Sequence, residues 1–507
     1  MFGNKRILAL DIGASKVVLA EFSVSREGAP ELLNYGISRL SPELSGEADT
    51  SAFIVTAVRD LMREHGIGPA PLYLTLSGQT VFPRFVKLPP VARDKVLQII
   101  RYEAEQNVPF PIEEVVWDYQ LMGDEGVEST PDEVNVLLVA AKTENLTRMT
   151  DCVDAAGLEP EVVDVAPMAL YNAVRFNYEN LQGCTMILDI GARSSNLIFL
   201  EEDRIFNRSI PVAGNTITQE IAKEFDVSFG EAENLKLEHA FVALGGVYAG
   251  AESDVTDRVS KVVRNVITRL HVEVNRSINF YRSQQGGTHP LRVLLAGGSS
   301  VIEHVDTFFR EKVKAEVEYL NPFVNLAVSE NLSTDRVETD LPLLGEVAGL
   351  GIRGSLACPI EINLMPPTLV ARKTLRKRQP FFIASAVGLV LIMLCWWVYF
   401  RRMEEVWDGR KQKLDLRLSL REETDANLQT ALERQAQIRQ RHEVLAKLAG
   451  KRSQWIEWMR AIHDCMLDGM WLRTLKPVER GGRMFIEISG RGFIDDLRPY
   501  QTPDQTP

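Results

Sequence analysis

The pattern of apolar and polar positions is clearest between Ile7 and Phe22, read as ILALDIGASKVVLAEF. An apolar run ends at Asp11, small and polar residues follow, and a second apolar run begins at Val17. This spacing predicts a strand, a tight turn and a second strand. The stretch Met186 to Leu200, MILDIGARSSNLIFL, repeats the same pattern around LDIGA. Two equivalent hairpins predict a duplicated α/β fold with a ligand between its halves.

Periodicity also predicts the elements between and after these hairpins. Residues 77–160 differ from their surroundings in sequence pattern and are interpreted as a small inserted α+β unit. We expect a further helix to start at Asp164 and continue to Phe176, with Pro167 near its first turn. Helices are predicted at 50–64, 93–105, 143–156, 212–225 and 254–282, and strands at 31–40, 72–76, 81–88, 115–121, 134–141, 205–211 and 291–296.

One segment predicts where the protein lies in the cell. The residues from 381 to 400, FFIASAVGLVLIMLCWWVYF, carry no charge, which predicts a transmembrane helix. A buried core helix is the alternative. Five basic residues and no acidic one lie in the preceding stretch: Arg372, Lys373, Arg376, Lys377 and Arg378. This basic excess predicts that the N-terminal side lies in the cytoplasm and the C-terminal side outside.

Residues 403–450 are rich in charged residues, Gln and Leu. Leu414 with Leu418, and Leu428 with Leu432, fit heptad positions, which predicts a coiled coil, although an ordinary solvated helix has a similar pattern. Residues 451–507 contain an apolar helix candidate, followed by strand candidates at 470–475 and 484–489. We expect a small α+β unit there.

Composition narrows the class of protein. The chain of 507 residues is long enough for several domains. Its formal net charge of −12 argues against a general nucleic-acid-binding protein, which needs a basic surface. The five cysteines are scattered singly, without zinc-type spacing, which is typical of a reducing compartment.

The glycine turns suggest phosphate chemistry. Glycine lets backbone N–H groups approach an anion, Ser15 and Lys16 add a hydroxyl and a positive charge, and Asp11 can hold Mg²⁺ through water. A single DxG turn is also compatible with an ordinary hairpin. Two later features fit the same ligand: Gly214 at a predicted helix start and the pair Gly297-Gly298 after a strand. Glu233 and Lys236 share one helix face, where either ribose contact or a solvated ion pair is expected.

The order DIGASK, DIGARSS, EAENLK and AGGSS resembles the actin-like and sugar-kinase nucleotide-binding fold. Within that fold, the phrases FPRFVKLP, YEAEQNVPFPIEEVVWDYQ, VLLVAAK, AGLEPEVVDV and EVNRSINFYRSQ resemble the PilM family of type IV pilus assembly. The resemblance implies a two-lobed actin-like ATPase fold over residues 1–356. It also implies that the inserted unit is similar to the 1C subdomain shared with the cell-division protein FtsA.

The same resemblance implies ATP and Mg²⁺ as ligands, with Asp11 and Asp189 holding magnesium through water. Relatives often carry Glu before the proline at 167, where this chain has Ala166, so we expect slow or absent hydrolysis unless Asp164 or Glu103 substitutes. The catalytic residues are unknown. The nucleotide-binding residues implied are Asp11, Gly13, Ser15, Lys16, Asp189, Gly191, Ser194, Gly214, Glu233, Lys236, Gly297, Gly298 and Ser299.

A short motif follows the predicted domain. Residues 362–366, INLMP, resemble the N-terminal motif by which PilN docks in a PilM cleft, and a plain linker is the alternative. The implied partner-binding residues are Ile362, Asn363, Leu364 and Pro366. The order of linker (357–380), transmembrane helix (381–400), coiled coil (403–450) and C-terminal unit (451–507) resembles PilN. The chain therefore resembles a PilM–PilN fusion with a truncated periplasmic unit, and its overall architecture is similar to GspL.

These expectations describe a single-pass inner-membrane, ATP-binding scaffold for type IV pilus assembly. Its expected partners are PilN/PilO-like platform proteins, a pilus motor ATPase or platform protein, and the lipid bilayer, with homo-oligomerisation left open and no nucleic acid. Three alternatives remain: a GspL-like type II secretion platform protein, an FtsA-like filament-forming membrane protein, and a sugar or acetate kinase.

Overall fold

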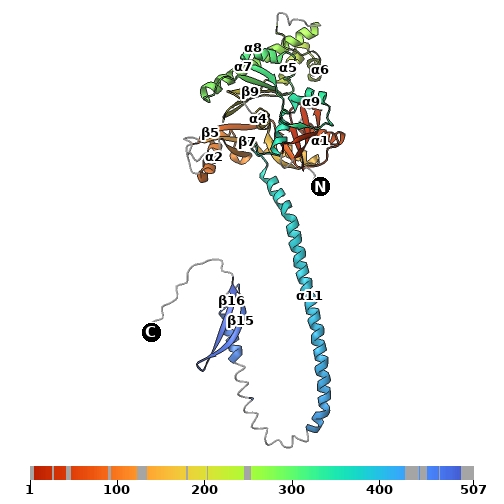
Figure 1. Cartoon of the computed structure of the whole chain (residues 1–507), viewed down its shortest axis with the longest axis vertical. Coiled ribbons are helices and arrows are strands. Elements are labelled where there is room, and N and C mark those ends of the chain that lie inside the picture. Colours follow the sequence, from red (N-terminus) through yellow and green to blue (C-terminus); the bar gives the residue numbers. More distant parts are fainter. Residues whose placement is uncertain are drawn as a thin grey trace, which may run out of the picture. The chain divides into compact units, whose positions relative to one another are not determined.

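The computed structural model describes residues 5–24, 28–40, 47–88, 93–122, 134–178, 181–202, 204–244, 253–428, 445, 454–466 and 469–492 (Figure 1). The chain divides into two compact units, Met1–Gln379 and Pro380–Pro507.

The first sheet of the N-terminal unit contains the first predicted hairpin at its centre. Its apolar run is continuous because both faces are covered: Leu8 and Leu10 lie in one core cluster, and Ile7 and Ala9 lie in another. The strands in order across the sheet are β14 (Ala327–Val328), β3 (Glu31–Arg39), β2 (Lys16–Val24), β1 (Lys5–Ile12), β4 (Leu72–Leu76) and β8 (Pro160–Val165).

The second sheet contains the repeated hairpin and is also covered on both faces. Ile187 belongs to the first core cluster, whereas Met186 and Leu188 belong to a second one. The parallel neighbour of the hairpin is the strand that ends at the predicted glycine pair. The strands in order are β11 (Arg204–Ile210), β10 (Ser195–Glu201), β9 (Thr185–Ile190), β12 (Arg292–Ala296) and β13 (Glu316–Tyr319).

A three-stranded antiparallel sheet lies in the stretch between β4 and β8, where the sequence predicted an inserted unit. Its strands in order are β5 (Val81–Leu88), β7 (Val134–Lys142) and β6 (Val115–Met122). Helix α2 (Arg93–Asn107) covers it through Ile100 and Ala104. Helix α3 (Thr143–Ala155) instead packs with α1 (Glu47–Glu64) in the main core, through Leu146 and Val153. Short 3-10 turns, η1 (Gly78–Thr80) and η2 (Ile112–Glu114), precede β5 and β6.

The prediction of a helix starting at Asp164 is wrong by two residues. Asp164 belongs to β8, where it lies opposite Thr75 of β4, and helix α4 (Ala166–Asn177) begins after it. The stretch Val162 to Val165 is strand because its residues pair with the buried β4, and Pro167 occupies the first turn of the helix.

Of the remaining helices of the N-terminal unit, those within 214–313 pack on the second sheet, and those within 334–353 cover one face of the first sheet. Helix α10 packs closely against α4. Their bounds are α5 (Gly214–Phe225), α6 (Phe229–His239), α7 (Asp254–Gln284), α8 (Val305–Val313), α9 (Thr334–Asp340), the 3-10 turn η4 (Leu341–Leu343) and α10 (Gly345–Arg353).

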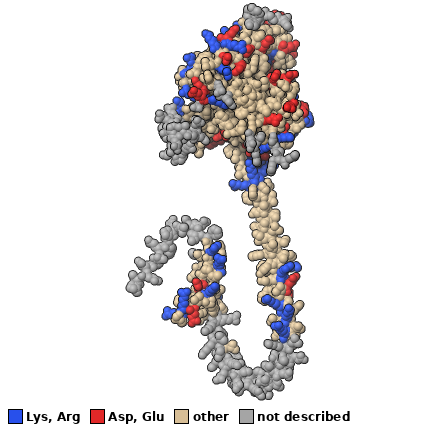
Figure 2. Space-filling model, in the orientation of Figure 1, with Lys and Arg blue, Asp and Glu red and all other residues tan. Residues whose placement is uncertain are grey.

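Helix α11 (Pro367–Leu428) starts in the first unit and continues into the second. Among the described residues it is the one helix long and apolar enough to cross a membrane, with a mean hydropathy of 2.4 in its most apolar window. Figure 2 shows an uncharged stretch along this helix between basic residues and a later mixture of charges. The predicted heptad position Leu432 lies outside the described residues.

The described part of the C-terminal unit contains a helix over 454–464 and a two-stranded antiparallel sheet. The strands are β15 (Met470–Arg480) and β16 (Arg483–Gly492), joined at Gly481 and Gly482. Both glycines have positive φ values, of 64° and 76°, which the tight turn requires. The strand positions agree with the prediction, and each strand extends several residues beyond it.

Candidate functional site

The first hairpin presents Asp11 and Lys16 at the end of the first sheet. The amide of Gly13 donates to the carbonyl of Lys16 at 2.9 Å, which closes the turn. Thr75 lies opposite Asp11 on the parallel strand β4, and its hydroxyl donates to Asp11 Oδ1 at 2.7 Å. The Lys16 ammonium donates to the carbonyl of Leu343 at 3.0 Å. Ser15 is exposed.

The second hairpin repeats this arrangement around Asp189. The amide of Gly191 donates to the carbonyl of Ser194 at 3.2 Å. Asn196 lies directly opposite Asp189 on β10, and its amide group donates to Asp189 Oδ2 at 2.9 Å. Each acidic residue is therefore oriented by a polar neighbour on the adjacent strand.

Asp11 and Asp189 lie close enough for the charge of Asp11 to affect the pKa of Asp189. Burial raises the pKa of Asp189, the Asn196 hydrogen bond and Lys16 oppose that rise, and the charge of Asp11 adds to it. A third carboxyl group, that of Glu346 in the first turn of α10, is also buried. Burial raises the pKa of Glu346 to about 8, Lys16 opposes the rise, and Asp11 and Asp189 add to it. Lys16 is thus the positive charge beside three acidic groups.

Three of the glycines predicted from sequence lie close together at the second hairpin: Gly191, Gly214 and Gly297. The amide of Gly214 and the hydroxyl of Ser299 both donate to the carbonyl of Gly191, at 3.1 Å each. Gly297 has a φ of +86°, and a Cβ there would collide with Asp189 Oδ1. A Cβ at Gly214 would likewise collide with the Ser299 hydroxyl. Only glycine fits these two positions without a shift of the neighbouring atoms.

Glu233 and Lys236 form a partly buried cluster rather than a solvated surface pair. Lys236 is 8% exposed and donates to Glu233 Oε2 at 2.7 Å and to the Thr218 hydroxyl at 3.0 Å. The Thr218 hydroxyl donates to Glu233 Oε2 at 2.5 Å. Burial lowers the pKa of Lys236, and Glu233 opposes that shift.

Sequence reasoning missed three groups at this site: Thr75, Asn196 and Glu346. Asn196 had a detectable signal, because it is a polar residue within an otherwise apolar strand that follows Asp189 after a tight turn. Thr75 had a weaker one, at the end of the apolar strand 72–76. Glu346 had none, since only the tertiary structure brings α10 beside the first hairpin.

The donor set fits a hydrated magnesium ion. Asp11 and Asp189 supply carboxylate oxygens, which are the ligands that Mg²⁺ and its bound water molecules prefer. Asn196 orients Asp189 through its amide group, whereas its Oδ1 faces Gly78 and has no hydrogen-bond partner among the described residues.

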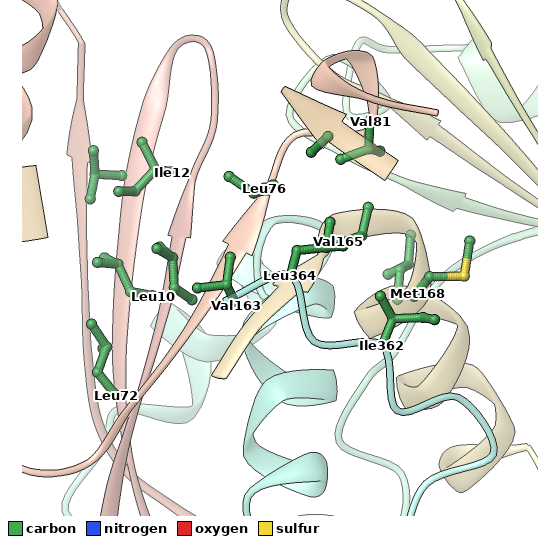
Figure 3. Packing of buried hydrophobic residues seen from close by; sticks show 14 of the residues in the cluster. Leu10, Ile12, Leu72, Leu76, Val81, Val163, Val165, Met168, Ile362 and Leu364 are labelled. Atoms are coloured by element: carbon green, nitrogen blue, oxygen red, sulfur yellow. The ribbon is translucent and has the colours of Figure 1, made fainter. Parts of the chain in front are cut away.

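A second structured site is the groove occupied by residues 360–365, which we call the docked segment. Ile360, Ile362 and Leu364 are fully buried and belong to the same core cluster as Leu10, Val163 and Met168 (Figure 3). Burial of each such side chain contributes roughly 1.5–3 kcal/mol. The docked segment is therefore part of the core of the N-terminal unit.

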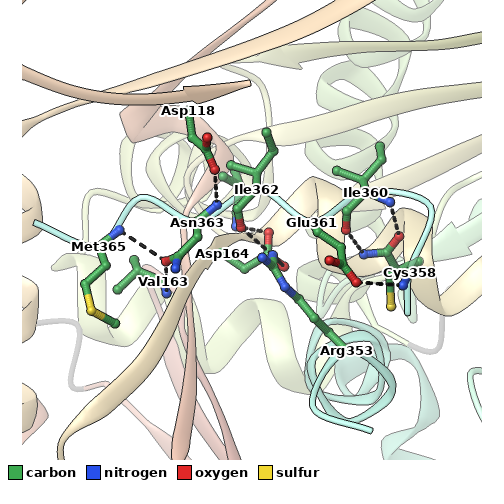
Figure 4. Close-up of polar contacts among 12 residues, drawn as sticks. Asp118, Val163, Asp164, Arg353, Cys358, Ile360, Glu361, Ile362, Asn363 and Met365 are labelled. Carbon is green, nitrogen blue, oxygen red and sulfur yellow. Dashed lines mark hydrogen bonds and ion pairs between the residues drawn. The ribbon is translucent and has the colours of Figure 1, made fainter. Parts of the chain in front are cut away.

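Backbone hydrogen bonds fix the register of the docked segment (Figure 4). Asn172 of α4 bonds both the carbonyl and the amide of Ile360, at 2.8 and 3.2 Å. The amide of Leu364 donates to the carbonyl of Val163 at 2.8 Å. Asn363 Oδ1 accepts from the amide of Val163 at 3.1 Å, and the Asn363 amide donates to Asp118 Oδ2 of β6 at 2.8 Å. The segment thus contacts both the first sheet and the inserted unit.

Arg353 and Asp164 form a buried ion pair beneath the docked segment. The side chain of Arg353 is 6% exposed and that of Asp164 is fully buried. The same guanidinium nitrogen also donates to the carbonyl of Ile362. Burial raises the pKa of Asp164, opposed by Arg353 and by the amide of Val165. The Asp164 carboxylate therefore has its hydrogen-bond partners within the groove.

The basic stretch at the start of α11 is paired with acidic residues of the domain. Lys373 contacts Glu161 at 2.9 Å, and Arg376 contacts Glu159 at the same distance. The hydrogen bond from Lys373 lowers the pKa of Glu161, and burial partly opposes it. These contacts fix the first turns of α11 against the N-terminal unit.

Comparisons with known proteins agree with this geometry. The solved structure described as "PilM-PilN type IV pilus biogenesis complex" superposes with a TM-score of 0.60 and 27% sequence identity, covering 69% of this chain and 99% of that chain. FtsA of Escherichia coli (strain K12) is 24% identical over 341 residues, 59% of this chain and 80% of the relative. FtsA of Buchnera aphidicola subsp. Schizaphis graminum is 20% identical over 378 residues, 67% of this chain and 90% of the relative.

The matched region coincides with the part of the chain that contains both hairpins and the inserted unit. The model of the family described as type IV pilus assembly protein PilM matches residues 9–355, which is more than half of the chain. The two glycine-turn hairpins, the inserted three-stranded sheet and this match lead to one conclusion: the chain belongs to the PilM family of type IV pilus assembly proteins.

Proposed function

We propose that this protein is a membrane-anchored, ATP-binding scaffold of a type IV pilus assembly platform, in which nucleotide state controls contacts with partner proteins. The observation that carries the proposal is the pair of buried, oriented carboxylates, Asp11 and Asp189, beside Lys16. A structural hairpin pair has no need of buried acidic residues at both turns, because each costs desolvation energy.

Bound Mg²⁺ would neutralise phosphate charge at this site. Asp11 and Asp189 would hold its water molecules, and Lys16 would contact phosphate directly. The remaining residues predicted from sequence divide into a phosphate group and a ribose and base group. The first comprises Gly13, Ser15, Gly191, Ser194 and Gly214, and the second comprises Glu233, Lys236, Gly297, Gly298 and Ser299.

We infer slow or absent hydrolysis. Position 166 before the α4 proline is Ala, which cannot orient an attacking water molecule. Asp164, the nearest acidic substitute in sequence, is held by Arg353 and by the amide of Val165. Its carboxylate is occupied in the groove and does not serve the phosphate site.

We further infer that the docked segment is a PilN-like motif carried in cis, with Ile362, Asn363, Leu364 and Pro366 as its recognition residues. In support, its apolar side chains are buried and its backbone is bonded on both sides. Only six residues separate Arg353 from Ile360, so the effective concentration of the segment is high. The proposed partners include PilN/PilO-like platform proteins and a pilus motor or platform protein.

The proposed location is the inner membrane. Residues 381–400 would cross it once, the N-terminal domain would lie in the cytoplasm, and residues beyond 401 would lie in the periplasm. Supporting this orientation, basic residues flank the N-terminal side of the uncharged run (Figure 2). A coiled coil over 403–450 and a PilN-like unit over 451–507 complete the proposed domain order.

The test is calorimetry of the full chain in phospholipid nanodiscs with ATP and Mg²⁺, together with single-turnover hydrolysis. We expect micromolar binding, at least 10-fold weaker binding in Asp11→Ala, and almost no phosphate release. Asp257→Ala is the matched control, because Asp257 forms an exposed ion pair on α7. Absence of ATP binding would refute the proposal, and rapid turnover would refute the inference drawn from Ala166.

A further inference from the structure

Helix α10 contacts the nucleotide site at one end and the docked segment at the other. It is 9 residues long, and a helix of that length spans about 13 Å. The carbonyl of Leu343, just before the helix, accepts from Lys16, and the carbonyl of Pro342 accepts from the amide of Gly297 at 2.9 Å. Both donors belong to the loops that we assign to the nucleotide.

The other end of α10 holds the docked segment. Arg353, its last residue, donates to the carbonyl of Ile362 as well as to Asp164. Because the guanidinium is almost fully buried, it has no solvent alternative for these bonds. A movement of the last turn of α10 would therefore alter the contacts that hold Ile362.

The packing of α10 on α4 makes such a movement concerted. A Cβ at Gly349 would collide with the carbonyl oxygen of Ala169, so the two helix backbones meet without a side chain between them. A Cβ at Gly345 would collide with Leu170. Helix α4 carries Asn172, which holds both backbone groups of Ile360. Helices α4 and α10, which both bond the docked segment, are therefore in direct backbone contact.

We propose that α10 couples the two sites, so that Mg-ATP binding loosens the docked segment and release of the docked segment strengthens Mg-ATP binding. This inference rests on the proposed function and deepens it by assigning the regulation of that site. The physical cause lies at Lys16. A phosphate oxygen carries negative charge and competes for the ammonium more effectively than the neutral Leu343 carbonyl does.

The direction of the coupling follows from which contact is lost. The docked segment and the Lys16–Leu343 bond occur together in this structure. When phosphate takes Lys16, the turn before α10 loses an anchor, and the helix that positions Arg353 is less firmly held. Linkage requires the reverse effect to have the same size. Couplings of this kind typically change affinity by about 5- to 150-fold.

The first experiment needs no variant. Hydrogen exchange of the full chain in nanodiscs is measured with and without saturating Mg-ATP. The reporters are the amides of Ile360 and Leu364, which are bonded to Asn172 and Val163. We expect exchange at least about 5-fold faster with Mg-ATP. Unchanged or slower exchange in a chain that binds Mg-ATP would overturn the proposal.

The reciprocal experiment measures Mg-ATP affinity by calorimetry in Ile362→Asp, which places a charge at a fully buried position and releases the docked segment. We expect at least about 5-fold tighter binding. Val370→Asp is the matched control, because Val370 is 46% exposed on α11 outside the groove, and its affinity should equal that of wild type. Equal or weaker binding in Ile362→Asp would overturn the proposal. If the wild-type chain binds no ATP, the proposed function itself fails, which is a separate outcome.

A third variant tests the route. Arg353→Lys keeps the positive charge beside Asp164 but loses the planar arrangement of donors that serves two acceptors. We expect the exchange difference caused by Mg-ATP to shrink severalfold while ATP affinity remains measurable. A full effect in Arg353→Lys would show that the coupling bypasses α10.

Discussion

The proposed nucleotide site and the groove of the docked segment differ in how their polar groups are satisfied. In the groove, Arg353, Asp164 and Asn172 all bond to partners from the same chain. In the proposed nucleotide site, the buried carboxyl groups of Asp11, Asp189 and Glu346 lie beside Lys16, whose ammonium donates to a neutral carbonyl. The groove is complete as folded, whereas the nucleotide site has donors and acceptors to offer to a ligand. Substitutions should therefore affect stability in the groove and ligand affinity in the nucleotide site.

The largest effect is expected in the groove. Arg353→Leu leaves Asp164 buried without its ionic partner, which costs about 3–5 kcal/mol of unfolding free energy. Chemical denaturation of the full chain measures it. The control is Arg310→Leu, which breaks a half-exposed pair with Asp306 and should cost less than about 1 kcal/mol. Similar losses in both variants would contradict the comparison.

The same variant has a pH signature. Burial raises the folded-state pKa of Asp164 above its ordinary value of 3.8, so the folded state favours the neutral carboxyl group. Stability linked to this group is present below the ordinary pKa and is lost as pH rises through the raised one. The cost of Arg353→Leu should therefore be smaller near pH 4 than at neutral pH.

A smaller effect is expected in the nucleotide site. Asn196→Ala removes the hydrogen bond to Asp189, and we expect Mg-ATP affinity to fall about 5- to 10-fold, the equivalent of about 1 kcal/mol or one ordinary hydrogen bond. Calorimetry with and without Mg²⁺ measures it. Asn207→Ala is the matched control, because Asn207 also has a buried unpaired Oδ1 but lies on β11, away from Asp189. Equal losses in the two variants would remove the special role of Asn196.

The smallest effect is expected at the start of α11. Glu161→Gln weakens the contacts with Lys373 and Lys377, and because Glu161 is 43% exposed, solvent screening keeps the loss well below about 1 kcal/mol. Its lowered pKa means that these contacts are present above the ordinary value of 4.5 and are lost as pH falls through the lowered value. Hydrogen exchange over 372–377 measures the loss, with Glu220→Gln on α5 as control. A change larger than that in Arg353→Leu would reverse the comparison.

Much of the fold was predictable because the relevant signals are local. The apolar runs around Asp11 and Asp189 predicted both hairpins, and α7 and β12 were predicted within two residues of their bounds. The start of α4 was wrong because Asp164 belongs to a strand only through its pairing with β4. Helical periodicity cannot register such pairing, since the neighbouring strand is distant in sequence.

The sequence by itself determined the two glycine-turn hairpins, the uncharged run before residue 401 and the order of segments along the chain. These features depend on backbone periodicity and composition within a few residues. The tertiary structure alone decided that Arg353 pairs with Asp164, 189 positions away, that Glu346 lies beside Lys16, and that Asn172 holds Ile360. Such contacts depend on how sheets and helices pack, because packing brings together side chains whose separation in sequence carries no periodic signal.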